Sequence, residues 1–123
     1  MIVTFLTEPT LERAPKGRFK LVTPLVALVA QELVTVPVGF TFDGASIPPL
    51  CWALISHPMA PSSLRAACLH DWGCVTRYAD SRTIHRTFHA ALLADGVAPM
   101  RAWLMGKAVA WFGPSFRTAP AVA

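Results

Sequence analysis

The sequence predicts an α+β fold, in which a small antiparallel β-meander in the N-terminal half is followed by three to four helices. Two observations predict it. Short apolar, β-rich runs fill the first part of the chain, whereas apolar residues at three- and four-residue steps occur in the second part. The length of 123 residues fits one domain, and we expect residues 1–123 to form it.

The strands are expected between the N-terminus and Pro37. The apolar run Ile2–Leu6 fits a strand, and a polar loop that ends near Gly17 follows it. Three further runs are separated only by Thr-Pro and Gln-Glu pairs, which predicts an antiparallel meander. These runs are Phe19–Val22, Leu25–Ala30 and Leu33–Val36.

The helices are expected after the Gly- and Pro-rich segment that leaves the sheet. A short helix fits Pro49–Ile55. A second helix is predicted from an N-cap at Ser62 or Ser63 to about Asp71 or Trp72, with Gly73 as its stop.

Two longer helices are predicted in the last third of the chain. Asp80 is expected to cap a helix that ends at Gly96, because its apolar residues recur at helical spacing. Pro99 suits a first helical position, which predicts a last helix over Met100–Phe112. This last helix holds Trp103 and Trp111, which fits either a core helix with one exposed stripe or an interfacial membrane helix. Residues 118–123 are expected to be a loose tail.

The composition narrows the classes of partner. Hydrophobic residues make up 54% of the chain and charged residues 15%, which excludes a disordered chain and predicts a surface buried by other proteins, by a membrane or by self-association. The net charge is +4, but no basic run interleaves with aromatic residues, so we expect no nucleic-acid partner. An attraction to anionic envelope surfaces stays open.

The cysteines and the apolar stretches indicate the redox compartment and argue against a thiolate zinc site and a transmembrane helix. Three cysteines without a leading signal-peptide pattern predict a reducing compartment at synthesis. The chain contains no Cys-x-x-Cys pair, which argues against a thiolate zinc site. No apolar stretch is long and uninterrupted enough to predict a transmembrane helix.

The adjacent residues His70 and Asp71 are the main candidates for chemistry. Neighbouring side chains on a helix point about 100° apart, so one can face the interior while the other faces a cleft or an ion. Asp43 and Ser46 lie in the turn that leaves the sheet. They either bond to nearby backbone N–H groups or point into a cleft shared with His70.

A divalent metal site is a second hypothesis. His85 and His89 are four residues apart, which places both on one helix face. With His70 and Asp71 they would supply three imidazoles and one carboxylate, a ligand set that suits zinc. Packed or half-exposed histidines explain the same spacing without a metal.

Several of these residues resemble a known family. The block Val36-Pro37-x-Gly39-Phe40-x-x-Asp43-x-Ala45-Ser46-Ile47-Pro48, then His70-Asp71, Phe88 and Ala108-Val109-x-x-Phe112-Gly113, is similar to the phage and bacterial family called domain of unknown function 1353. The likeness covers roughly residues 19–113.

The resemblance implies a context rather than a mechanism. Members are typically encoded in phage and prophage genomes near tail and lysis genes, and no activity is firmly attached to them. This chain departs from the family pattern at Phe42, Trp72, Cys74 and His85. His85 stands where the resemblance implies a carboxylate.

A weaker likeness is to secreted and viral phospholipases of the A-two type, whose catalytic helix also contains His-Asp. This likeness implies His70 as the general base and Asp71 as a calcium ligand, with Asp43 as a substitute orienting group. A glycine-rich calcium loop is missing just upstream of His70.

Two functions follow as expectations. The first is a virion or tail-associated component, made in the bacterial cytoplasm and incorporated into a phage particle with other virion proteins or with copies of itself. In such a virion component the His-Asp cluster would stabilise the fold and have no catalytic role. The second is a small hydrolase of phospholipid or cell-envelope material with His70 as its base.

Overall fold

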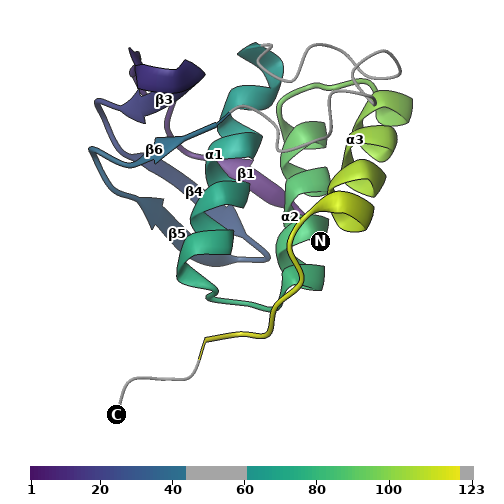
Figure 1. Cartoon of the computed structure of the whole chain (residues 1–123). Helices are drawn as coiled ribbons and strands as arrows, with labels where there is room; N and C mark the ends of the chain where they lie inside the picture. The colour runs from purple at the N-terminus through teal and green to yellow at the C-terminus, as the bar shows by residue number, and fades with distance from the viewer. Residues whose placement is uncertain (44–60, 120–123) are drawn as a thin grey trace.

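The computed structural model describes residues 1–43 and 61–119, with side chains from residue 64 onward in the second range. Within them the α+β prediction is confirmed: strands fill the N-terminal part and helices follow (Figure 1). The strands are β1 (Val3–Phe5), β2 (Leu11–Ala14), β3 (Arg18–Leu21), β4 (Leu25–Val29), β5 (Glu32–Val36) and β6 (Thr41–Phe42). The helices are α1 (Pro61–Thr76), α2 (Ser81–Ala94) and α3 (Pro99–Phe112), and a 3-10 turn spans Pro15–Gly17.

The first sheet has the strand order β1-β4-β5 and is antiparallel throughout. In β4, Leu25, Ala27 and Val29 are buried and the residues between them are partly exposed, which is the alternation of a sheet with one covered face. Ala30 and Gln31 join β4 to β5 with positive φ angles of 48° and 70°. Such a two-residue turn matches the twist of a hairpin.

The predicted meander is wrong in one connection. The run Phe19–Val22 forms β3, which pairs with β2 and β6 in a second sheet instead of with β4. β2 lies in the expected polar loop. A three-residue turn, in which Lys16 and Gly17 have positive φ angles, pairs β2 with β3. No residue of β2 is buried, so its hydrophobic pattern could not indicate a strand.

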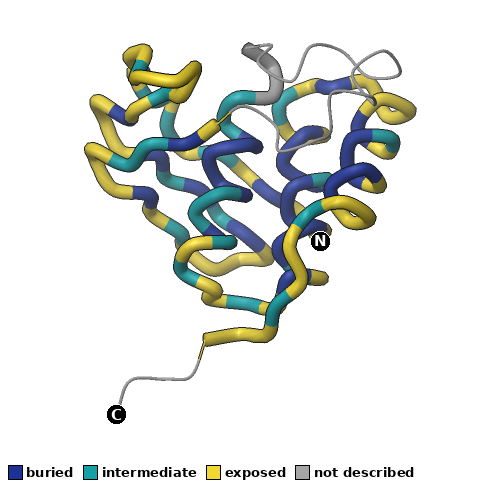
Figure 2. Tube along the Cα trace, in the orientation of Figure 1, coloured by how far each residue is buried: buried dark blue, intermediate teal, exposed yellow. Residues whose placement is uncertain are grey.

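The helices form a layer on one side of the strands. α1 packs against α2 and contacts β5 and β6, α2 contacts β1, and α3 packs against α2 (Figure 1). Buried residues concentrate where the helices face each other and the strands (Figure 2). Phe42, Phe88 and Leu21 are among the largest fully buried side chains, so one core spans both parts of the fold.

Gly73 does not end α1, contrary to the prediction. The helix continues to Thr76 and ends where Arg77 adopts a positive φ of 52°. A Cβ atom on Gly73 would lie 2.6 Å from Ile84 Cδ1 of α2. Glycine at this position therefore allows two helices to approach closely, and its local preference for helix ends is overridden.

The predictions for α2 and α3 agree with the structure, except at the cap. Asp80 precedes α2 but makes no side-chain cap bond; its carboxylate accepts hydrogen bonds from the Thr118 backbone N–H and hydroxyl. Ala119 N–H also donates to the Arg77 carbonyl over 2.8 Å. The expected loose tail is therefore attached at its first two residues.

Some predictions lie outside the described residues. They are the role of Ser46, the helix Pro49–Ile55 and the tail from residue 120. The predicted N-cap is wrong, because α1 begins at Pro61 and both Ser62 and Ser63 lie within it.

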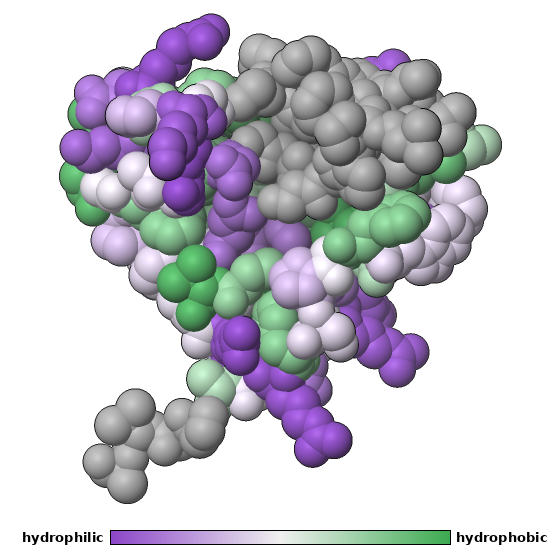
Figure 3. Space-filling model, viewed as in Figure 1, coloured by the Kyte–Doolittle hydropathy of each residue, from purple (hydrophilic) through white to green (hydrophobic). Residues whose placement is uncertain are grey.

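Figure 3 shows the surface of the molecule in the orientation of Figure 1. Hydrophilic side chains gather over the hairpin of β2 and β3, at the upper left. Charged residues of both signs occupy this hairpin, and Lys20 lies 3.7 Å from Glu12. None of the helices in the described ranges has the length and apolar character needed to cross a bilayer.

Candidate functional site

The candidate site lies on the side of α1 that faces α2. His70 is buried there, with 3% of its side chain exposed, and its ring centre is 5.2 Å from that of Phe88. Asp71 lies around the helix from it, with 17% of its side chain exposed. The two side chains thus diverge as the sequence predicts: the imidazole points into the fold and the carboxylate toward its edge.

Aromatic packing brings the end of β6 to α1. Phe42 is fully buried, and the ring of Phe40 meets Trp72 edge-on at 5.2 Å. As a result the Asp43 backbone N–H donates to Asp71 Oδ2 over 3.2 Å. The Asp43 carboxylate does not join the cluster: it lies 3.6 Å from Arg18 and is 60% exposed. The strand-exit turn therefore reaches Asp71 through its backbone, not through a second carboxylate.

His85 of α2 is the direct partner of His70. The Nε2 atom of His70 lies 2.9 Å from Nδ1 of His85, and the rings are stacked with centres 5.1 Å apart. On its other side, Nε2 of His85 lies 2.9 Å from the carbonyl oxygen of Pro114, in the segment after α3. The histidine pair therefore connects two helices and the C-terminal segment.

The Pro114 carbonyl at the end of this hydrogen-bonded series determines which nitrogens of the two histidines carry protons. A carbonyl oxygen only accepts, so His85 Nε2–H donates to Pro114. Burial lowers the pKa of His85, although its hydrogen bond to the Pro114 carbonyl acts in the opposite direction. His85 is therefore neutral at neutral pH, and its Nδ1 is an acceptor. His70 therefore donates through Nε2, and its Nδ1 remains as the end of the chain.

The surroundings of His70 Nδ1 are Asp71 and Cys74. Asp71 Oδ1 is 3.8 Å away, too far for a hydrogen bond, and Cys74 Sγ is 3.9 Å away. Burial, aided by Asp71, raises the pKa of the Cys74 thiol to about 11. The thiol is therefore protonated at neutral pH and is not an activated nucleophile.

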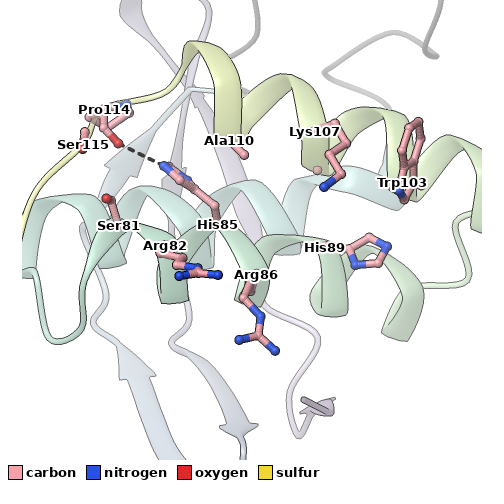
Figure 4. Close-up of a pocket in the computed structure, with 11 residues that line it drawn as sticks. Ser81, Arg82, His85, Arg86, His89, Trp103, Lys107, Ala110, Pro114 and Ser115 are labelled. Atoms are coloured by element: carbon pink, nitrogen blue, oxygen red, sulfur yellow. Dashed lines mark hydrogen bonds between the residues drawn. The ribbon is translucent and has the colours of Figure 1, made fainter.

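The predicted metal ligands are not assembled. His89 is not grouped with His70 and Asp71: together with His85 it lines a groove between α2 and α3 (Figure 4), and it approaches Gly106. His70 and His85 use one nitrogen each on their mutual hydrogen bond. Within residues 1–43 and 61–119, no three His, Cys, Asp or Glu side chains are grouped so as to hold a metal ion.

The buried His85 predicts a pH-dependent stability. A base whose folded pKa lies below its ordinary value of 6.5 is charged more readily in the unfolded chain. Its contribution to stability is therefore complete above about pH 6.5 and falls as the pH decreases through the folded pKa. Thermal unfolding between pH 7.5 and pH 5.5 is expected to show a midpoint that decreases with acidification.

The matched variants are His85→Gln and His89→Gln, two changes on the same helix. The first is expected to lower stability at neutral pH and to flatten its dependence on pH. The second, at a half-buried position in the groove, is expected to retain the wild-type slope. An unchanged slope in His85→Gln would show that protonation of this imidazole is not linked to folding.

Sequence reasoning missed two members of the cluster. Cys74 lies four residues after His70, on the same helix face, so the spacing could have indicated it. The Pro114 carbonyl has no sequence signal, because a backbone oxygen joins the site only through the path of the chain after α3.

Comparisons of the sequence with known proteins identify two curated relatives and one family. Two curated relatives come from Sinorhizobium fredii (strain NBRC 101917 / NGR234). Uncharacterized protein y4jT is 38% identical over 81 residues, which is 66% of this chain and 24% of the relative. Uncharacterized protein y4iH is 40% identical over 72 residues, or 58% of this chain and 30% of the relative. The chain thus matches less than a third of the length of each.

No solved structure matches this chain. These matches do not show the likeness to phospholipases of the A-two type. The family model described as protein of unknown function (DUF1353) matches residues 19–109, close to the range that the sequence blocks indicated. Because this match spans well over half of the chain, the protein belongs to the DUF1353 family.

Proposed function

We propose that this protein is a non-catalytic, virion- or tail-associated component of a phage or prophage particle, in which the His70 cluster stabilises the fold. The observation that carries the proposal is the closure of the cluster. His70 is 3% exposed and its Nε2 is occupied by His85. A general base needs its free nitrogen within reach of a proton on water or substrate. The only nitrogen left, Nδ1, faces Asp71 and Cys74.

The outer face of the β1-β4-β5 sheet suits an assembly partner. The helices cover the other face, and the residues that alternate with the buried ones point outward. We call the apolar members of this set the open sheet face: Ile2, Leu6, Val26, Leu28 and Leu33. Ile2 is 78% exposed and Leu33 64% exposed. A contiguous apolar surface of this kind marks a protein–protein contact more often than a solvated surface.

The test is incorporation into particles. Particles purified after prophage induction of the encoding strain are expected to contain the chain, as measured by mass spectrometry. The double variant Ile2→Lys/Leu33→Lys is expected to fold but to be lost from particles, because two charges on the open sheet face oppose its burial. The matched control is Val38→Lys/Val75→Lys, at exposed positions of 58% and 69% outside that face. Wild-type chain that stays outside purified particles contradicts the proposal.

The alternative is a hydrolase with His70 as general base, and one observation favours it. The Pro114–His85–His70 chain fixes one tautomer of His70 and directs its free Nδ1 toward Asp71, the most exposed member of the pair. An orienting hydrogen bond on one imidazole nitrogen is what a catalytic histidine requires on the side away from its substrate.

His70→Leu separates the two functions. A structural role predicts a loss of about 1–3 kcal/mol in unfolding free energy, because His85 Nδ1 loses its buried donor, while incorporation continues below the unfolding temperature. The hydrolase predicts that the wild type releases products from phospholipid or peptidoglycan and that the folded variant does not. Turnover of either substrate by the wild type, abolished in His70→Leu, would replace the assembly proposal.

A further inference from the structure

A groove between α2 and α3 carries a concentration of positive charge. It has a volume of about 540 Å³, and Figure 4 shows Arg82, Arg86 and His89 from α2 on one side and Trp103 and Lys107 from α3 on the other. We call these five residues the basic groove. Arg82, Arg86 and His89 recur at steps of four and three residues, so they form one stripe along α2.

The positive charge of the basic groove is not neutralised by the protein. All seven acidic side chains of the chain fall in its described parts, and none lines the groove. Four of them are engaged elsewhere: Glu12, Asp43 and Asp95 lie in ion pairs, and Asp80 accepts from Thr118. No carboxylate side chain lies within 4.0 Å of the charged nitrogens of Arg82, Arg86 or Lys107. Three cations around one hollow thus have no acidic side chain as a counter-ion in the described parts of the chain.

Apolar side chains border the basic groove. On α3, Met100, Trp103 and Trp111 recur at steps of three and eight residues, which places them on the same face as Lys107. They are 70%, 48% and 72% exposed. On α2, Leu93 extends the arginine stripe by one turn and is 44% exposed. The Lys107 ammonium lies 5.9 Å from the centre of the Trp103 ring, so the cationic and aromatic parts are in contact.

This combination selects one class of ligand. Phosphate groups satisfy arginine and lysine, and tryptophan with aliphatic side chains favours the boundary between head groups and acyl chains. A free phosphate would leave the exposed Met100 and Trp111 unexplained. Single-stranded nucleic acid would stack on the tryptophans but gives no reason for the aliphatic Met100 and Leu93 beside them.

We propose that the basic groove binds the phosphate of an anionic phospholipid and that the exposed faces of α2 and α3 lie on the membrane surface. The groove is lined by His85 as well, but the inference does not depend on the proposed function. The groove lies on the helical side of the fold, and the open sheet face lies on the other. It assigns a peripheral contact, in which Met100, Trp103 and Trp111 enter the interfacial region while the three cations meet the head groups.

The experiment is sedimentation of the purified chain with vesicles. Binding to phosphatidylcholine vesicles that contain phosphatidylglycerol is expected, with none to phosphatidylcholine alone. Arg82→Gln/Arg86→Gln/Lys107→Gln is expected to weaken binding by roughly a hundredfold, since each surface cation contributes about 1 kcal/mol toward an anionic membrane. The matched control Arg13→Gln/Lys16→Gln/Lys20→Gln removes the same charge from the β2–β3 hairpin and is expected to retain most of the binding.

A second variant tests the apolar contribution. Trp103→Ser/Trp111→Ser is expected to weaken vesicle binding while its remaining affinity still falls with added salt. All substituted side chains are exposed, so thermal unfolding midpoints are expected to stay near the wild type.

Three outcomes would overturn the proposal. One is equal loss of binding in the groove and hairpin variants, which would indicate net charge alone. Another is equal binding to neutral and anionic vesicles. The third is binding of inorganic phosphate or a single-stranded oligonucleotide through the same three cations when anionic vesicles do not bind.

Discussion

Arg65→Met is expected to lower the free energy of unfolding by about 3–5 kcal/mol, because it leaves a buried carboxylate without its partner. Arg65 of α1 donates through Nε to Asp95 Oδ1 over 2.9 Å and forms a second bond to the same oxygen through Nη2. The side chain of Asp95 is only 5% exposed. Burial raises the pKa of Asp95 even though Arg65 acts in the opposite direction.

Arg65 also connects elements that are far apart in sequence. Its Nη1 donates to the Thr7 carbonyl over 3.0 Å, and its guanidinium lies 4.4 Å from the centre of the Phe5 ring. One side chain thus joins α1, the end of β1 and the C-terminus of α2. A carboxylate at a helix C-terminus is unfavourable for the helix dipole, so Asp95 depends on this partner.

The measurement is denaturant unfolding of matched variants. Arg18→Met breaks the exposed pair with Asp43 and is expected to change stability by about 1 kcal/mol or less. The double variant Arg65→Met/Asp95→Leu is expected to recover most of the loss, since it removes the unpaired charge along with its partner.

The pH dependence provides an independent check. The loss in Arg65→Met is expected to shrink as the pH falls, because protonation neutralises the orphaned carboxyl group. A loss that stays constant down to acidic pH would attribute the effect to lost packing on Phe5 instead of to the buried charge.

The sequence predicted correctly those helices and strands whose formation depends on residues close together in the chain. The apolar repeat of α2, Pro99 at the start of α3 and the apolar run that forms β4 all appear in the structure as expected. β2 was not predicted because none of its four residues is buried, so its sequence lacks the hydrophobic pattern of a strand. Its pairing with β3 depends on a turn that contains two positive φ angles. The prediction that Gly73 ends α1 was wrong for a related reason. Gly73 is needed where Ile84 of α2 packs closely against α1, a contact that the local sequence does not indicate.

The candidate site was predicted only in part. His70 and Asp71 diverge from adjacent positions as predicted, and the metal hypothesis grouped His85 with His70, which it does contact. The Asp43 carboxylate turned toward solvent because Arg18 in the neighbouring strand offers it an exposed partner. The Arg65–Asp95 pair has no signal in spacing, since 30 residues separate its members and only the tertiary fold brings them together.

Phe88→Ala is expected to lower the free energy of unfolding by about 3–5 kcal/mol, since it removes a large buried ring and leaves a cavity. Phe88 is 1% exposed and belongs to the core that α1, α2 and the strands share. Its ring centre is 5.2 Å from that of His70, so the cavity would open directly beside the histidine pair. Leu93→Ala, on the same helix but 44% exposed, is expected to change stability by about 0.5 kcal/mol or less.

A double-mutant cycle with His70→Leu tests whether this packing and the hydrogen-bonded pair act together. If the Phe88 ring holds His70 against His85, the pair is already loosened in Phe88→Ala, and the second change removes less than it does in the wild type. The expected coupling is about 0.5–3 kcal/mol, the range for residues in contact. Additive losses would mean that the His70–His85 bond forms independently of the core beneath it. In that case α1 and the segment at Pro114 position the cluster, and Phe88 contributes only its own burial.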